Sequence, residues 1–224
     1  MPVITISKEF ASGGVEIARK LAEKLGYDYF DKEIVKEISE RARVSHQEVR
    51  DFEAESHANF RAYLSRLIDL DIFKKDGAED NGQEVETTYD TRDKLPYSFD
   101  TQGWIDADIY REMICKVVSD LSQRSNVIIV GRGGQCILGE QAGVINIRII
   151  ASLKDRIARL QVEQPDLDEA AARKLIAEMD KKSREYINFY FNKEWDNPGL
   201  YDIVINTSRL SDNKVIESLA VLCK

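Results

Sequence analysis

The residues with the clearest chemistry lie in a small-residue turn close to the start of the chain. A short β-branched run, Val3-Ile-Thr-Ile6, is followed by Ala11, Ser12, Gly13 and Gly14. After the turn, apolar residues recur every four positions, as expected for the buried face of a helix. A strand, a turn and a helix in this order leave several backbone N–H groups and the positive end of the helix dipole at the turn. This stretch therefore predicts an anion site, for which phosphate is the usual ligand.

The turn departs from the standard phosphate-loop motif, in which Gly and four further residues precede Gly-Lys-Ser/Thr. When Gly13 is placed on the second glycine, Lys8 falls on the first one, Gly14 on the lysine and Val15 on the hydroxyl residue. The backbone cradle can survive these changes, but the ammonium and the magnesium-binding hydroxyl cannot. We therefore expect phosphate binding here with the catalytic cations supplied from elsewhere, and Lys8 is one residue that could reach back as a replacement. An ordinary strand–helix junction without a ligand stays open as the alternative.

Composition limits the class of protein. The chain has 224 residues, 43% of them hydrophobic and 32% charged, and its net charge is −8. This size favours one α/β domain with room for an insertion. The acidic balance argues against general nucleic-acid binding, and the sequence contains neither a membrane-spanning apolar run nor a signal-like start. We therefore expect a cytoplasmic protein with a small-molecule partner, no nucleic acid and no membrane.

Metal and disulfide sites are not expected from the sequence. The three cysteines are odd in number and irregularly spaced, which predicts free thiols. His46 and His57 have no Cys or His partner nearby, so a metal role for them is not expected.

A second candidate site follows a strand predicted at 126–130. Its four consecutive β-branched residues predict burial on both faces, as in the centre of a parallel sheet. Gly131-Arg132-Gly133-Gly134 stands at the carboxyl end of this strand, where open α/β sheets bind their ligands. An arginine on such a turn suits bidentate contact with phosphate. Pairing of Arg132 with a local carboxylate is the alternative.

Apolar runs predict the frame that positions these turns. Strands are predicted at 3–6, 126–130, 144–150 and 202–206. Since helical segments separate them, the sheet should be parallel and covered by helices on both faces. The helix that follows the third strand, capped by Ser152, carries Arg156 and Arg159 on neighbouring positions of one face.

Two longer segments should lie outside this frame. An amphipathic stripe from Phe60 to Phe73 and a polar stretch at 74–99 predict a helical and loop insertion at about 42–105. The stripe leaves a homo-oligomer open, although a core helix explains it equally well. A basic and aromatic segment, which begins with a capping box at Asp166, predicts a helical lid at about 166–197. A solvated charged helix is the alternative.

Five segments make the sequence similar to the cytidylate-kinase-like proteins, a divergent branch of the phosphate-loop nucleoside monophosphate kinases. They are 6–14, 29–33, 130–133, 150–156, and 180–184 continued by 201–208. The resemblance implies a three-layer P-loop NTPase fold with a central parallel sheet, formed by one domain whose core is 1–41 and 106–224. It also implies ATP with Mg²⁺ as phosphate donor, and CMP or dCMP as the favoured acceptor.

The resemblance further implies roles for individual residues. The residues expected at the donor phosphates are Ala11, Ser12, Gly13, Gly14, Arg156 and Arg159. The residues expected at the acceptor are Asp31, Arg132 and Gly133. The residues expected to supply positive charge for phosphoryl transfer are Lys8, Arg132, Lys181 and Arg184.

Three departures from the family pattern bear on activity. Ala11 and Val15 stand where the divergent branch usually has Gly and Arg, and Gly133 stands where true cytidylate kinases have Asp. Loss of one preorganised charged donor typically lowers a rate by about two to three orders of magnitude. Two functions therefore remain open: a cytidylate-kinase-like phosphotransferase, and a non-catalytic nucleotide- or anion-binding protein on a degenerate kinase scaffold.

Overall fold

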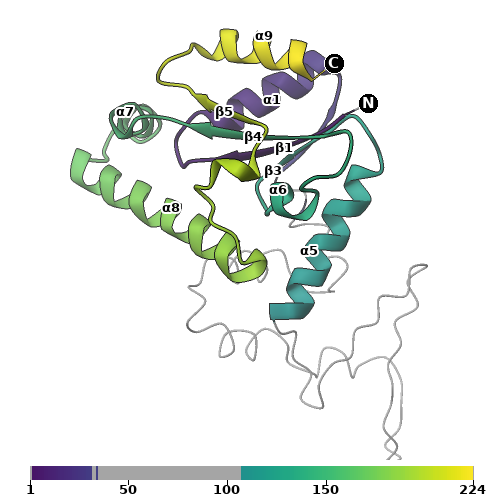
Figure 1. Cartoon of the computed structure of the whole chain (residues 1–224). Helices are drawn as coiled ribbons and strands as arrows, with labels where there is room; N and C mark the ends of the chain where they lie inside the picture. Colours follow the sequence, from purple (N-terminus) through teal and green to yellow (C-terminus); the bar gives the residue numbers. More distant parts are fainter. Residues whose placement is uncertain (1, 32–33, 35–106, 224) are drawn as a thin grey trace, which may run out of the picture.

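The computed structural model describes residues 2–31, 34 and 107–223 of the chain. At its centre is a parallel sheet of five strands in the order β2-β3-β1-β4-β5 (Figure 1). The strands are β1 (Val3–Lys8), β2 (Asp28–Phe30), β3 (Val127–Val130), β4 (Val144–Ile150) and β5 (Ile203–Asn206). The four predicted strands are all present, so the parallel sheet is confirmed.

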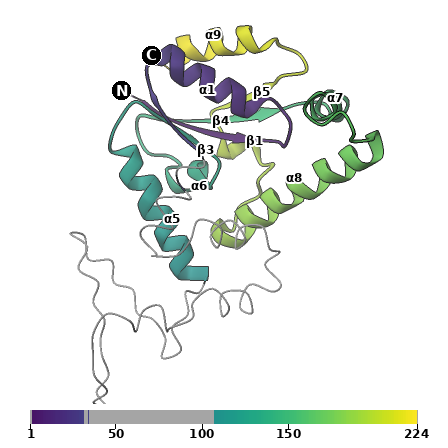
Figure 2. The same ribbon diagram turned by 180° about the vertical axis from the view of Figure 1, so that it is seen from behind.

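Helices cover both faces of this sheet (Figures 1 and 2). On one face lie α1 (Gly14–Leu25) and α9 (Asp212–Leu222), and on the other lie α5 (Ala107–Ser122) and the short α6 (Gly134–Ile137). The connection from β4 to β5 contains α7 (Leu153–Glu163), α8 (Glu169–Phe191) and the 3-10 turn η3 (Pro198–Leu200). The described part of the chain thus has the three layers that the sequence predicts.

Alternation along the strands divides the core between the two faces. Ile4 and Ile6 of β1 pack with α1 and α9, whereas Val3 belongs to the cluster formed with α5. All four residues of β3 are buried, as expected for a central strand. A smaller apolar cluster joins α7 to α8, and Phe10 and Ala11 pack against it. The turn after β1 is therefore supported by the connection between β4 and β5.

Local sequence signals set most helix ends. Gly26 ends α1 with a φ of 68°. Ser152 Oγ accepts the N–H of Asp155 at the start of α7, as predicted. The predicted cap Asp166 is wrong by two residues. Asp168 caps α8, because its carboxylate accepts the N–H of Ala171 three positions later.

Several predictions fall outside the described residues. These are the insertion at 42–105, its aromatic stripe, the polar stretch at 74–99 and the two histidines, and all of them stay predictions. Of the helices that can be described, none is long and apolar enough to cross a membrane.

Candidate phosphate-binding site

The two predicted turns lie at the same edge of the sheet. β1 pairs with β3 from Ile4 opposite Ile128 to Ile6 opposite Val130, so both strands end side by side. The N–H of Gly131 donates to the carbonyl oxygen of Ile6 at 2.9 Å, which ties the start of the second turn to β1. The structure therefore brings the loop after β1 and the loop after β3 together, as the carboxyl-edge rule for open α/β sheets requires.

Each turn contains one residue with a Cβ, Ala11 or Arg132, in the left-handed backbone conformation. In the first turn Ala11 has a φ of 58° and Gly13 a φ of 82°. In the second, Gly131, Arg132 and Gly133 have φ values of 73°, 54° and 72°. This conformation costs a residue with a Cβ about 1–2 kcal/mol, and such strain is concentrated at functional sites. Ala11 therefore adopts a conformation that glycine, usual at this point in the family it resembles, would hold without strain.

Hydrogen-bonding groups at the first turn are left for a ligand. Among the described residues, the N–H groups of Gly13 and Gly14 donate to no other backbone group. Ser12 is 1% exposed, and its Oγ has no hydrogen-bond partner in the part of the chain that the structure describes. The Ser12 carbonyl oxygen accepts from Thr207 Oγ1 at 2.7 Å, which holds the turn from the end of β5. A buried hydroxyl without a partner costs about 1–3 kcal/mol, so a bound oxyanion would relieve it.

Lys8, the last residue of β1, lies against the start of α1. A Cβ placed on Gly14 would be 2.8 Å from the Cβ of Lys8 and 3.1 Å from its Cδ. Position 14 therefore has no room for the standard loop lysine while Lys8 keeps its place. Burial lowers the pKa of the Lys8 ammonium, Asp31 and Asp180 raise it, and Arg132 lowers it further. Lys8 therefore interacts electrostatically with residues that follow β2 and β3 as well as with α8.

Arg159 brings a second cation to the first turn. Its guanidinium carbon lies 3.7 Å from the position of a Cβ on Gly13, and its Nη1 donates to the carbonyl oxygen of Ala11 at 3.4 Å. Lys8 and Arg159 thus approach the Ser12–Gly14 turn from β1 and α7. This is the convergence of basic side chains that a phosphate site needs, since neither the standard lysine nor the family's arginine is present.

Arg156 is buried and supports the first turn through the backbone of Phe10. It is 5% exposed, and its Nε donates to the carbonyl oxygen of Phe10 at 2.7 Å. Its other nitrogens lie 2.5 Å from Asp180 and 3.3 Å from Glu9. Asp180 in turn accepts the N–H of Phe10 at 2.9 Å. Both backbone polar groups of Phe10 are therefore bound by side chains of α7 and α8, and Arg156 is placed to support the turn rather than to reach across it.

The two predicted cations of α8 are placed differently. Arg184 is about half exposed and donates from Nε to Asp196 at 2.5 Å, and this hydrogen bond raises the pKa of the guanidinium. Lys181 is 72% exposed and pairs with Glu185 at 3.6 Å on the helix surface. The structure therefore brings Lys8 and Arg159 to the first turn, and leaves Lys181 on the outer face of α8.

The predicted acceptor residues lie after β2 and β3. Asp31 accepts a hydrogen bond from the hydroxyl of Tyr29 at 3.4 Å. Gly133 lies under the ring of Phe191, so that a Cβ on Gly133 would be 2.3 Å from Cε2 of the ring. An aspartate at this position, as in true cytidylate kinases, would collide with the ring. Phe191 therefore occupies the space into which that aspartate would project.

Sequence reasoning missed several residues that build the site. They are Glu9, Asp180, Thr207, Phe191 and a buried network around Arg148. A signal existed for Arg148, because Asn146 and Arg148 interrupt the apolar β4 strand at alternate positions and so face the same side. No comparable signal marks Thr207, whose partner is a backbone carbonyl 195 positions away.

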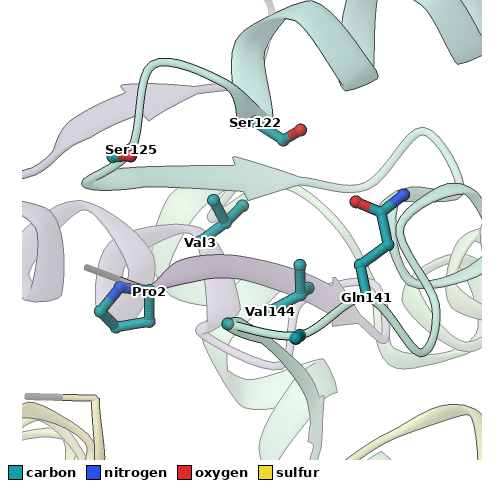
Figure 3. Close-up of a pocket in the computed structure, with 8 residues that line it drawn as sticks. Pro2, Val3, Ser122, Ser125, Gln141 and Val144 are labelled. Carbon is teal, nitrogen blue, oxygen red and sulfur yellow. The ribbon is translucent and has the colours of Figure 1, made fainter.

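A cavity of about 420 Å³ lies away from these turns. Figure 3 shows it at the amino ends of β1 and β4, where Pro2, Val3, Gln141 and Val144 line it. Its lining contains no ionisable side chain and lies at the opposite edge of the sheet from Lys8 and Arg132. This cavity is therefore not part of the candidate site.

Comparisons with known proteins show which family and which solved structures the chain is similar to. The model of the cytidylate kinase-like family matches residues 3–209. The structure is similar to that of an uncharacterized protein from Eubacterium ventriosum, with a TM-score of 0.64 and 19% identity over 99% of this chain and 97% of that one. A shikimate kinase from Bacteroides thetaiotaomicron aligns over 99% of this chain and 95% of that chain, with a TM-score of 0.48 and 15% identity.

One further match is partial. A uronate isomerase from Corynebacterium glutamicum is 32% identical over 93 residues, which are 40% of this chain and 17% of that protein. The chain thus spans less than a fifth of the length of that relative.

The family model, in contrast, covers nearly the whole chain, including both turns and the connection from β4 to β5. The three-layer P-loop kinase fold that the sequence predicts is therefore confirmed, and the chain belongs to the cytidylate kinase-like family.

Proposed function

We propose that this protein is a phosphotransferase that moves the γ-phosphate of ATP to a nucleoside monophosphate or a similar small acceptor, with CMP and dCMP as the favoured candidates. One observation carries the proposal. Lys8 and Arg159 converge on a turn whose Ser12 hydroxyl is buried without a partner among the described residues. Phosphoryl transfer needs mainly positioning and neutralisation of charge, which such a site can supply.

The donor phosphates would lie on the first turn. The N–H groups of Gly13 and Gly14 and the hydroxyl of Ser12 would bind phosphate oxygens, and Lys8 would replace the standard loop lysine. Arg159 would neutralise charge from the α7 side. Arg156 would act through the backbone of Phe10, keeping the turn in the conformation that binds phosphate.

Mg²⁺ would enter with ATP rather than through a dedicated protein cage. The described residues contain no group of three His, Cys, Asp or Glu side chains that could hold a metal ion, and Val15 offers no hydroxyl. Magnesium in nucleotide sites is commonly bound by substrate phosphates, waters and one or two protein ligands. The ion would supply charge neutralisation to the phosphates, and the cations of this chain would supply the rest.

The acceptor would lie at the second turn. Arg132, held in a strained left-handed conformation, would bind the acceptor phosphate through its guanidinium fork. Phe191 fills the space beside Gly133, and Asp31, which follows β2, would contact the acceptor base. The contact between Phe191 and Gly133 is a reason to test acceptors beyond cytidine nucleotides.

A phosphorus NMR time course with ATP, Mg²⁺ and each of CMP, dCMP, UMP and AMP tests the proposal. We expect ADP to appear together with the diphosphate of one acceptor. Arg132→Ala should lower that rate by about 10²- to 10³-fold, whereas the exposed Lys174→Ala should leave it unchanged. An Arg132→Ala protein with full turnover would disprove the role of Arg132.

The second candidate is a nucleotide or anion sensor without turnover. It is favoured by Val15 and Gly14, which lack the standard hydroxyl and ammonium, and by the absence of a carboxylate at Gly133. Calorimetry separates the two candidates, because a sensor binds ATP while the phosphorus spectrum stays unchanged with every acceptor.

A further inference from the structure

A carboxylate between β4 and α8 joins two arginines. Asp196 lies in the connection that follows α8, and its Oδ1 accepts from Nη2 of Arg148 while its Oδ2 accepts from Nε of Arg184. Both distances are 2.5 Å. One of these arginines belongs to the central sheet and the other to α8, so Asp196 connects the core to an arginine that the family resemblance assigns to phosphoryl transfer.

The Arg148 side of this connection is fixed. Arg148 is 4% exposed, and its Nη1 donates to the carbonyl oxygen of Trp195 at 2.6 Å and to the hydroxyl of Tyr201 at 3.1 Å. The guanidinium lies 4.1 Å from the centre of the Trp195 ring, whose Nε1 donates to Ser7 Oγ at 2.8 Å. Because these partners come from β1, β4 and the loop before β5, the position of Asp196 is set by the core of the protein.

Arg184, in contrast to Arg148, is exposed to solvent. The side chain is 48% exposed, and its guanidinium lies 5.5 Å from the centre of the Trp195 ring. Only Nε is engaged, since Nη1 and Nη2 donate to no group within the ranges that the structure describes. The two terminal nitrogens of a guanidinium form the edge that binds phosphate in a bidentate way. Asp196 therefore holds Arg184 without using this edge.

Arg184 lies one helical turn after Asp180, the residue of α8 that binds the first turn. Asp180, four residues earlier on the same face of α8, binds the N–H of Phe10, and Asp180 and Glu9 both act electrostatically on Arg184. A polyphosphate bound at the Ser12–Gly14 turn that reached along α8 would meet a guanidinium that Asp196 already orients.

We propose that Asp196 is a positioning residue, which binds Nε of Arg184 and so keeps the Nη1–Nη2 edge available for a phosphoryl group of the bound donor. This inference rests on the proposed function, since it concerns the same donor site. It assigns to Asp196 an indirect role through Arg184, with Arg148 as the anchor. The opposite arrangement, in which Asp196 withholds Arg184 from phosphate, predicts the opposite effect on affinity.

The first test needs no ligand. Arginine Nε–H groups in stable hydrogen bonds give slowly exchanging signals in ¹⁵N NMR spectra, and the Arg184 signal can be assigned by its loss in Arg184→Lys. In Asp196→Ala we expect the Arg184 signal to be lost to solvent exchange, while the Nε–H signal of Arg156, bound to the carbonyl oxygen of Phe10, persists as the internal reference. Persistence of the Arg184 signal in Asp196→Ala would overturn the proposal.

The second test is calorimetric titration with MgATP and, separately, with tripolyphosphate. Asp196→Ala and Arg184→Ala should each weaken binding about tenfold, and the double variant should be no weaker than Arg184→Ala alone. Asp212→Ala, which removes a partly exposed carboxylate at the start of α9, serves as the control and should bind as the wild type does. Tighter binding by Asp196→Ala, or additive losses in the double variant, would overturn the positioning role.

The proposed function and the role of Asp196 can be disproved separately. If the wild type binds neither MgATP nor tripolyphosphate, the proposed function is wrong, and the ligand-free spectra still decide whether Asp196 orders Arg184. If the wild type binds both ligands and the single variants bind equally well, the donor site stands and the role of Asp196 is wrong.

Discussion

At the residue scale, Lys8 and Gly14 must be considered together. The standard loop carries its lysine at the position of Gly14, and this chain carries a lysine at the end of β1 whose stem fills the space above Gly14. A side chain at position 14 and the present position of Lys8 exclude each other sterically. The missing lysine of the motif is therefore compensated in space by a residue six positions earlier in the sequence.

The steric conflict between Lys8 and a side chain at position 14 predicts the result of restoring the standard lysine there. Gly14→Lys should lower the stability by about 1–3 kcal/mol because of overpacking, and should weaken the binding of MgATP because Lys8 is displaced. Lys8→Gly, which removes the Cβ that lies 2.8 Å from the Cβ of a residue at position 14, should recover both properties when combined with Gly14→Lys. Thermal unfolding and calorimetry measure them, with Lys8→Gly alone as the reference. A Gly14→Lys protein that is fully stable and binds MgATP more tightly would contradict the steric argument.

The lowered pKa of Lys8 predicts a pH effect. In the unfolded chain the pKa is near the ordinary 10.5, and burial lowers it in the folded chain. Between these two values the unfolded state binds more protons, so the contribution of Lys8 to stability rises with pH in that window, and below it the full burial penalty remains. A bound polyphosphate should raise the pKa again, so binding at a pH just below the ordinary value of 10.5 should take up protons.

Calorimetry at that pH, in two buffers with different ionisation enthalpies, measures the proton uptake. Lys8→Met should abolish it. Equal apparent enthalpies for the wild type in both buffers would show that Lys8 does not sense the ligand.

At the scale of elements, α8 is attached to the first turn by hydrogen bonds that need no ligand. Asp180 binds the N–H of Phe10 and pairs with the buried Arg156. Arg184, one helical turn after Asp180, is bound by Asp196. The segment proposed as a lid at 166–197 thus contains a helix whose central part is anchored. A closing motion, if the lid proposal holds, would involve the ends of this segment rather than the turn around Asp180.

The buried pair predicts a large effect on stability. Asp180→Asn keeps an acceptor for Phe10 but leaves Arg156 without its closest carboxylate, so unfolding in urea should require about 3–5 kcal/mol less free energy. Glu178→Gln removes a surface pair with Lys182 on the same helix and should change the free energy by less than about 1 kcal/mol. Equal effects of the two substitutions would show that the buried network does not stabilise the turn.

At the scale of the whole molecule, a chain with a net charge of −8 gathers cations at one edge of its sheet. Lys8 comes from β1, Arg132 from the loop after β3 and Arg159 from α7. The acidic remainder disfavours extended polyanions, while the local cluster favours a small anion. The fold thus offers an explanation for the proposed selectivity for nucleotides over nucleic acid.

Binding at this edge should stabilise the folded state as a whole. A ligand at a hundred times its dissociation constant adds about 2.7 kcal/mol, which corresponds to a rise in Tm of about 5–10 °C for a chain of this length. Differential scanning fluorimetry with MgATP should show this rise, and adenosine, which lacks phosphates, should produce little of it. Equal shifts with adenosine and MgATP would show that contacts outside the first turn contribute most of the binding free energy.

The sequence by itself determined the frame of this protein. Apolar β-branched runs and helical periodicity are local patterns, so they located β1, β3, β4 and β5, and the connections between them required a parallel sheet. The order strand, turn and helix selected the turn around Gly13, and the rule that ligands bind at the carboxyl edge of such sheets selected the turn around Arg132. Ordered motifs along the chain were enough to identify the family.

Only the tertiary structure decided which charged side chains face the turn and which support it. Arg156 and Arg159 are three residues apart on one helix, yet the first is buried against Asp180 and Phe10 while the second lies over Gly13. Phe191 covers Gly133 through a contact that spans 58 positions of sequence (191 − 133). Such partners are chosen by packing between distant elements, for which spacing along the chain carries no signal.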